Sequence, residues 1–216
     1  MPDCTGVVPD LIASGDALYG ARVNSTKGFI QWASDHHAFN PTGWEGEFGF
    51  SRPNDNQRPF GRALAAIWCL NYSAEDWWNE GYGLDFLNWA QRYVEENIVE
   101  LVASCGGGGA VAGTDRDAGY TELFLPFFYE RSVPERAGTL VHEARHASGK
   151  SHDSGKRDSS WQYNGAWRWH AVWLAKFSSG GKRTSKALRT LARQRANLII
   201  DQKFDEHPGF YIPTPP

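Results

Sequence analysis

The stretch from His142 to His152 has the residue types and the spacing of a catalytic metal site. His142 and His146 are four residues apart, so in a helix they lie on one face, about one turn apart. Two imidazoles placed in this way can bind one ion at about 2.0–2.1 Å, the usual Zn–N distance. Gly149 can turn the chain back after the helix, which returns His152 as a third ligand. Three protein ligands leave a fourth position for water or substrate, which is typical of catalytic zinc.

Two further side chains are candidates for chemistry beside the ligands. Glu143 follows His142 directly, next to the ion but not bound to it, where a general base for a metal-bound water belongs. Tyr163 lies eleven residues after His152 and is predicted to donate a hydrogen bond to a developing oxyanion. The pattern therefore indicates hydrolysis by activated water.

A helix must position these residues, and its start is visible in the sequence. Ser132 and Glu135 have the spacing of a capping box, with Pro134 in the first turn. We expect the helix to begin at the residue after Ser132 and to end near Ser148. Apolar residues within it would bury one face and place the metal site at the edge of a core.

The same residues match the long zinc-binding motif H-E-x-x-H-x-x-G-x-x-H of the metzincin metallopeptidases, and Asp153 follows as in the adamalysin-like branch. The resemblance covers this motif alone. It implies a Zn²⁺ ion held by His142, His146 and His152, with Glu143 as general base in the hydrolysis of a peptide or protein substrate. It also implies a zincin-like fold.

Metzincins carry a methionine-containing turn beneath the metal, whereas the only methionine in this chain is Met1. Either another side chain forms that floor, or the same ligand set belongs to a different zincin scaffold. A helix is expected from residue 164 or 165 to residue 177, and we predict that it packs beneath the zinc. His170 or an aromatic side chain of this helix would then form the floor. The aromatic candidates are Trp167 and Trp173.

Two alternatives to a peptidase stay open. A non-haem iron oxygenase would use His142, His146 and a carboxylate, with Asp153 in place of His152. A non-catalytic interaction module would hold a structural zinc, which needs a fourth protein ligand that the sequence does not indicate. The H-E-x-x-H helix followed by a glycine and a third histidine fits zinc and peptide hydrolysis better.

The remaining elements predict an α+β fold, mostly helical with a small mixed sheet. We expect a single domain over residues 1–216, with the active-site helix closing its first part, 1–149, and helices in its second part, 150–216. Further helices are predicted from apolar periodicity. They span residues 62–70, 84–105 and 184–201.

Strands are expected at two places. One lies near Phe29–Trp32, in a region read as loops with short strands, where Asp35-His36-His37 is interpreted as a polar loop rather than a second metal site. The other covers Tyr120–Tyr129, where Pro126 indicates a sheet edge. An extended peptide could pair with such an edge.

Composition narrows the possible classes of protein. The chain is 41% hydrophobic and 22% charged, which is typical of a globular protein. Its formal net charge of −3 gives no general attraction to nucleic acid, and no apolar run reaches the roughly 18 residues of a membrane span. The first residues lack the features of a signal peptide, so localisation stays open between the cytoplasm and a non-classical export route. Cys4, Cys69 and Cys105 are widely spaced, which favours free thiols and leaves one disulfide open.

Overall fold

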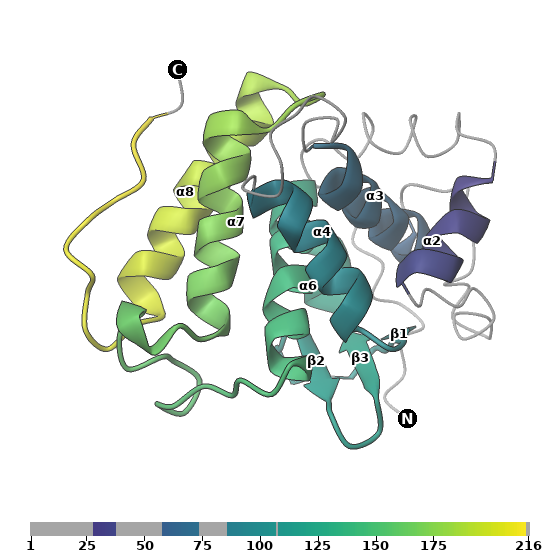
Figure 1. Ribbon diagram of the computed structural model, residues 1–216, viewed down its shortest axis with the longest axis horizontal. Helices are drawn as coiled ribbons and strands as arrows, with labels where there is room; N and C mark the ends of the chain where they lie inside the picture. The colour runs from purple at the N-terminus through teal and green to yellow at the C-terminus, as the bar shows by residue number, and fades with distance from the viewer. Residues whose placement is uncertain (1–27, 38–57, 74–85, 107, 215–216) are drawn as a thin grey trace.

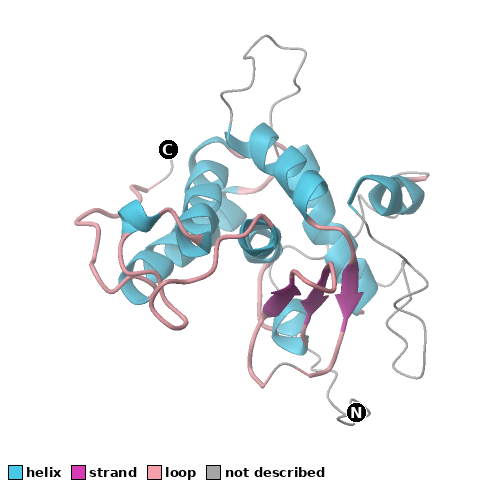
Figure 2. Ribbon diagram, turned by 60° about the horizontal axis from the view of Figure 1, so that its bottom comes forward, coloured by secondary structure: helices cyan, strands magenta, loops and turns pink. Residues whose placement is uncertain are grey.

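The computed structural model of the chain describes residues 28–37, 58–73, 86–106 and 108–214. Within them the molecule is mostly helical with one small mixed sheet, which confirms the α+β class. Figure 2 shows the three strands together at one side of the helices. The helices are α2 (Phe29–His37), α3 (Pro59–Tyr72), α4 (Phe86–Asn97), α5 (Leu125–Tyr129), α6 (Val133–Ala147), α7 (Ala166–Gly180) and α8 (Lys186–Gln202), with a short 3-10 turn at Trp161–Tyr163. The strands are β1 (Leu101–Ala103), β2 (Ala112–Asp115) and β3 (Tyr120–Leu123).

Helix α6 lies at the centre of this arrangement, as Figure 1 shows. It packs against α3, α4, α7 and α8, and its C-terminal part lies along β2. Its residues from Val133 to Ala144 are almost all buried. His142 and Glu143 are therefore only 5% and 4% exposed, although both are polar. A helix surrounded in this way holds its side chains rigidly, which a metal site requires.

The sheet has the order β1-β3-β2, with β1 parallel and β2 antiparallel to the central strand β3. The strand predicted over Tyr120–Tyr129 is confirmed for its first four residues alone, and its predicted position at the edge of the sheet is wrong. Only Tyr120–Leu123 is extended, and it is the central strand rather than an edge. Pro126 instead stands in the first turn of α5, where its missing N–H removes no helical hydrogen bond. The edge beside α6 is β2.

Two other local predictions are wrong. The helix predicted over residues 84–105 ends at Asn97, and Leu101–Ala103 pairs with β3 instead. The apolar residues of Leu101–Ala103 are compatible with the buried face of a helix and also with a strand. Pairing with β3 favours the strand. Phe29–Trp32 is helical, because Phe29, Ala33 and His37 recur every four residues and form the buried face of α2.

The predicted helices on either side of the metal motif are confirmed. Helix α3 contains the predicted segment 62–70, α7 contains the segment up to Phe177, and α8 begins after its N-cap Ser185, whose hydroxyl accepts from the Leu188 N–H. Helices α7 and α8 pack against each other and against α6. Cys105 is disulfide-bonded, so the single disulfide left open by the sequence is present.

Candidate metal centre

Helix α6 begins and ends as its sequence predicts. At its start the Ser132 N–H and hydroxyl both donate to Glu135 Oε2, at 2.9 and 2.8 Å. At its end Gly149 adopts a φ of 97°, a left-handed conformation that costs glycine little. The Gly149 N–H donates to the His146 carbonyl, and the chain then turns towards His152. The turn brings the third histidine back over the last turn of the helix.

The three predicted ligands converge. One nitrogen from each of His142, His146 and His152 lies within 4.8 Å of the other two. The Nε2 atoms of His142 and His146 are 3.1 Å apart. Two nitrogens bound tetrahedrally to one zinc at about 2.0–2.1 Å would be about 3.3 Å apart. His142 and His146 thus need little movement to share an ion. Among the described residues, the three histidines are the one group of side chains placed closely enough to hold a metal ion together.

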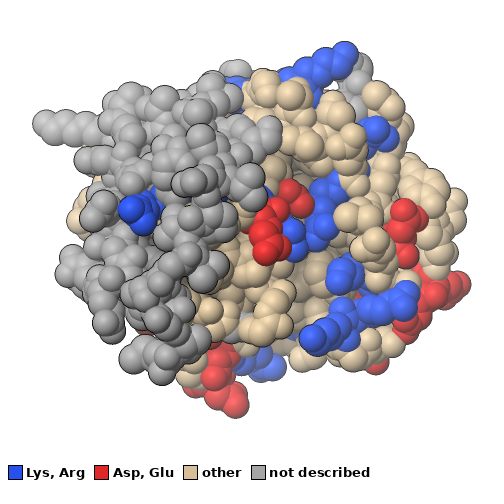
Figure 3. Space-filling model, turned by 180° about the vertical axis from the view of Figure 1, so that it is seen from behind, with Lys and Arg blue, Asp and Glu red and all other residues tan. Residues whose placement is uncertain are grey.

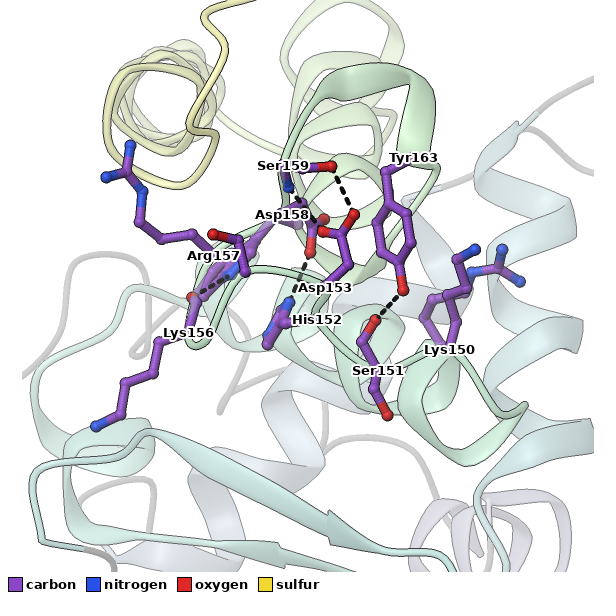
Figure 4. A network of polar contacts seen from close by, with 12 residues as sticks. Lys150, Ser151, His152, Asp153, Lys156, Arg157, Asp158, Ser159 and Tyr163 are labelled. Carbon is purple, nitrogen blue, oxygen red and sulfur yellow. Dashed lines mark hydrogen bonds and ion pairs between the residues drawn. The ribbon is translucent and has the colours of Figure 1, made fainter.

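In two of the predicted ligands, His146 and His152, a hydrogen bond at Nδ1 leaves Nε2 to face the site. His146 Nδ1 lies 2.8 Å from the Lys150 carbonyl oxygen. His152 Nδ1 lies 2.7 Å from Asp158 Oδ1, and Figure 4 shows this second contact. Because a carbonyl or carboxylate oxygen can only accept a hydrogen bond, the Nδ1 of each histidine carries the proton. Its Nε2 then keeps a free lone pair for a metal ion. This is the usual way in which proteins orient histidine ligands. The donor set therefore fits Zn²⁺.

Asp158 was not predicted from the sequence. Its side chain is fully buried, and a Cβ at position 165 would lie 2.6 Å from its Cγ, so Gly165 makes the room that this carboxylate occupies. No spacing rule distinguishes Asp158 from Asp153, which is only five residues earlier. Asp153 is exposed and instead closes the loop, with its carboxylate accepting from the N–H and hydroxyl of Ser159 at 2.7 and 2.5 Å (Figure 4).

Glu143 lies beside the ligands and is held by the sheet. Its Oε2 accepts a hydrogen bond of 2.9 Å from the hydroxyl of Thr114 on β2. Burial raises the pKa of Glu143 to about 7, against the opposing effect of the Thr114 hydrogen bond. A carboxyl with a pKa near neutrality is suited to accept and return protons at physiological pH. Thr114 was not predicted, because its approach depends on the pairing of β2 with β3.

Helix α7 supplies the floor that was predicted in place of a methionine. The ring centroid of Trp167 is 4.3 Å from that of His142, and its ring stacks on His152 with centroids 5.5 Å apart. The His170 ring is 5.8 Å from His142. Gly138 on α6 permits this approach, since a Cβ there would lie 2.6 Å from His170 Cδ2. Trp173, the other candidate, is buried against Phe177.

Tyr163 does not join the site. Its hydroxyl donates to the Ser151 carbonyl at 2.6 Å, and the Lys150 ammonium lies over its ring, 3.9 Å from the centroid. Figure 4 shows the hydroxyl directed at Ser151. It is not among the residues that line the cavity at the histidines. The aspartate and histidines at residues 35–37 lie on α2, where His37 is buried against Asn71 rather than exposed in a loop.

A cavity of about 450 Å³ opens onto the three histidines and Glu143. One wall is the segment from Gly108 to Thr114, which includes most of the edge strand β2. The opposite walls come from α6, α7 and α8 and from the loops beside them. The side chains there are Arg131, Thr139, Lys156, Trp167, His170, Arg195 and Lys203. A volume of this size is sufficient for a few residues of a peptide.

Comparison of the chain with protein-family models, with curated proteins and with solved structures finds no match. Among the described helices, none combines the length and the apolar character required to cross a membrane. Function is therefore inferred from the geometry of the site.

Proposed function

We propose that the protein is a zinc-dependent metallopeptidase with a zincin-like fold and a site similar to that of the metzincins. The observation that carries this proposal is the convergence of His142, His146 and His152 beside the buried Glu143, in a cavity bordered by the edge strand β2. A structural zinc site would be closed by a fourth protein ligand. Within the described part of the chain, the metal-binding group contains the three histidines alone, which supports an open and catalytic site.

Zinc held by these histidines would lower the pKa of water to about 7 and polarise a substrate carbonyl. Glu143 would take the proton of the attacking water and deliver it to the departing amine. The hydroxyl of Thr114 keeps the carboxyl of Glu143 in place for both steps. The floor formed by Trp167 and His170 would hold the ligand rings still during these steps.

The edge strand offers a way to bind an extended peptide. On one side β2 pairs with β3, and on the other side its residues line the cavity. An extended substrate could add to this side by backbone hydrogen bonds, which would place its carbonyl groups in front of the histidines. From the sequence, an extended peptide was expected to pair with a sheet edge at residues 120–129. In this proposal it pairs with residues 112–115 instead.

The oxygenase alternative finds no support in the geometry. It requires Asp153 as a ligand in place of His152. Both carboxylate oxygens of Asp153 accept hydrogen bonds from Ser159, whereas His152 is directed at the other histidines and fixed by Asp158.

The proposal is tested by measuring metal and activity on the same preparation. Protein purified without added metal is expected to hold about one zinc per chain by elemental analysis. A mixed peptide pool, read by mass spectrometry, should show cleavage. Glu143→Gln should retain the zinc and lose activity by about 10²–10⁴-fold, the usual contribution of a general base.

The matched control is Glu206→Gln, the same change at an exposed position. It should keep both zinc and activity. If Glu143→Gln remains active, or if it loses the metal, then Glu143 does not act as the base. If the wild-type protein binds iron or cleaves no peptide, the assignment as a zinc peptidase is wrong.

A further inference from the structure

The cavity is strongly basic apart from its catalytic carboxyl. Arg131, Lys156, Arg195 and Lys203 line it, and Glu143 is the one acidic residue among the lining residues. Figure 3 shows lysine and arginine side chains around the centre of the rear face of the molecule, with acidic side chains on one side of them. The formal charge of the whole chain is −3, so this concentration of positive charge is local. A cavity with one sign of charge attracts ligands of the opposite sign.

Three of these cations come from two segments of the chain and meet at the cavity. Arg131 precedes α6, Arg195 belongs to α8, and Lys203 follows the end of α8. The Lys203 ammonium lies over the Trp167 ring, 4.6 Å from its centroid, and the same ring contacts the predicted ligands His142 and His152. The positive charge is thus one aromatic ring away from the metal ligands.

The structure neutralises this charge only in part. Arg195 forms an ion pair of 3.2 Å with Glu135. Arg131 lies 4.0 Å from a carboxylate oxygen of Glu130, whose side chain is 63% exposed, so water screens that contact. Burial, followed by the charges of Arg195 and Arg131, lowers the pKa of Lys203. These cations therefore repel one another, and an anion in the cavity would relieve that repulsion.

A buried histidine in the same cavity independently indicates a ligand. His170 is 4% exposed, and neither of its ring nitrogens has a hydrogen-bond partner among the described residues. A buried polar group without a partner costs free energy, which a water molecule, an ion or a ligand that bonds to it would recover. An imidazole donates a hydrogen bond through at least one of its two nitrogens. An anionic oxygen can accept that hydrogen bond.

We propose that Arg131, Arg195, Lys203 and His170 form a subsite for a carboxylate of the peptide substrate, next to the bond that is cleaved. This proposal rests on the proposed peptidase function. The carboxylate can belong to an aspartate or glutamate side chain of the substrate or to its C-terminus. Arginine suits this role because its guanidinium binds carboxylates through two parallel hydrogen bonds.

The preference for a substrate carboxylate over the corresponding amide is measured with matched peptides. Each peptide carries glutamate or glutamine at one position within three residues of the cleaved bond, with an amidated C-terminus. A further pair differs only in a free or an amidated C-terminus. We expect at least a ten-fold higher kcat/KM for one carboxylate peptide over its amide partner. The position of that pair identifies the source of the carboxylate. A ratio near one in every pair overturns the proposal.

Variants connect the preference to the named residues. Lys203→Met keeps the apolar contact with Trp167 and removes the charge, and Arg131→Gln removes the second charge. Both should lower the carboxylate-to-amide ratio several-fold at unchanged zinc content. Lys186→Gln is the control, because Lys186 is exposed at the start of α8 and outside the cavity. A ratio that falls equally in the control means that general charge, not the subsite, sets the preference.

A binding measurement separates this proposal from the peptidase proposal. Succinate and succinamide are titrated into zinc-loaded protein, with tryptophan fluorescence as the signal. Succinate should bind at least ten-fold more tightly, and Lys203→Met should remove most of the difference. If this holds while no peptide is cleaved, the subsite stands and the peptidase function fails. If peptides are cleaved but succinate binding is equal in wild type and Lys203→Met, the subsite fails alone.

Discussion

Replacement of Asp158 by asparagine tests whether a buried carboxylate controls the third metal ligand. The asparagine side chain has nearly the same shape, so the space provided by Gly165 would still be filled. The change removes the negative charge from a fully buried group that lies 2.7 Å from His152 Nδ1. The imidazole of His152 would then face a neutral amide, whose oxygen accepts the Nδ1 proton more weakly and whose NH₂, when turned toward the ring, favours the tautomer with the proton on Nε2.

The expected effect follows from this single contact. Loss of a partner that orients a metal ligand typically costs 10–100-fold in metal affinity. This corresponds to about 1.4–2.7 kcal/mol of binding free energy. We expect Asp158→Asn to lie toward the upper end of this range, because the hydrogen bond is short and shielded from water. His146 keeps its own contact with the Lys150 carbonyl, so binding is weakened rather than lost.

Zinc affinity is measured by competition with a chelator of known affinity, at a pH where the chelator is fully characterised. The control is Asp153→Asn, the same chemical change in the same loop, where the carboxylate is exposed and bonded to Ser159. It should leave zinc affinity within about two-fold, because this carboxylate does not contact a ligand. An equal loss in both variants, or a larger loss in Asp153→Asn, would refute the assignment of Asp158 and favour Asp153 as the residue at the metal.

Three other expectations can be checked on the same protein. Trp167→Ala should weaken zinc binding and lower the free energy of unfolding by about 2–4 kcal/mol, somewhat less than for a fully buried tryptophan, as chelator competition and urea unfolding would show. Chelation of zinc by EDTA should lower the melting temperature reversibly, because zinc at a thousand times its dissociation constant stabilises by about 4 kcal/mol; an unchanged melting curve would contradict a bound metal. Burial lowers the pKa of His37 to about 4, so protonation disfavours the folded state, and the free energy of unfolding should fall by up to about 3 kcal/mol as the pH decreases from 6.5 to 4. His37→Gln should lose less stability over that range in urea unfolding of the metal-free protein, and an identical loss would show that His37 does not cause it.

The sequence alone determined the features that depend on contacts within one helix or turn. The capping box at Ser132, the pairing of His142 with His146 one turn later, and the left-handed turn at Gly149 all follow from local geometry. The aromatic floor was also predictable, because the helix that follows the ligand loop had to pack near it. Short-range periodicity is a sufficient guide where each residue's neighbours are only a few positions away.

Only the tertiary structure decided the features that depend on distant partners. Leu101–Ala103 became a strand and Tyr120–Leu123 became the centre of the sheet through pairing between segments about twenty residues apart. The pairing of β2 with β3, together with the packing of β2 on α6, carries Thr114 to Glu143. Arg131, Arg195 and Lys203 are spread over more than seventy positions in the sequence, and only the packing of α6 against α7 and α8 makes them neighbours in one cavity. Strand pairing and charge clustering are set by long-range contacts, and a local pattern does not contain them.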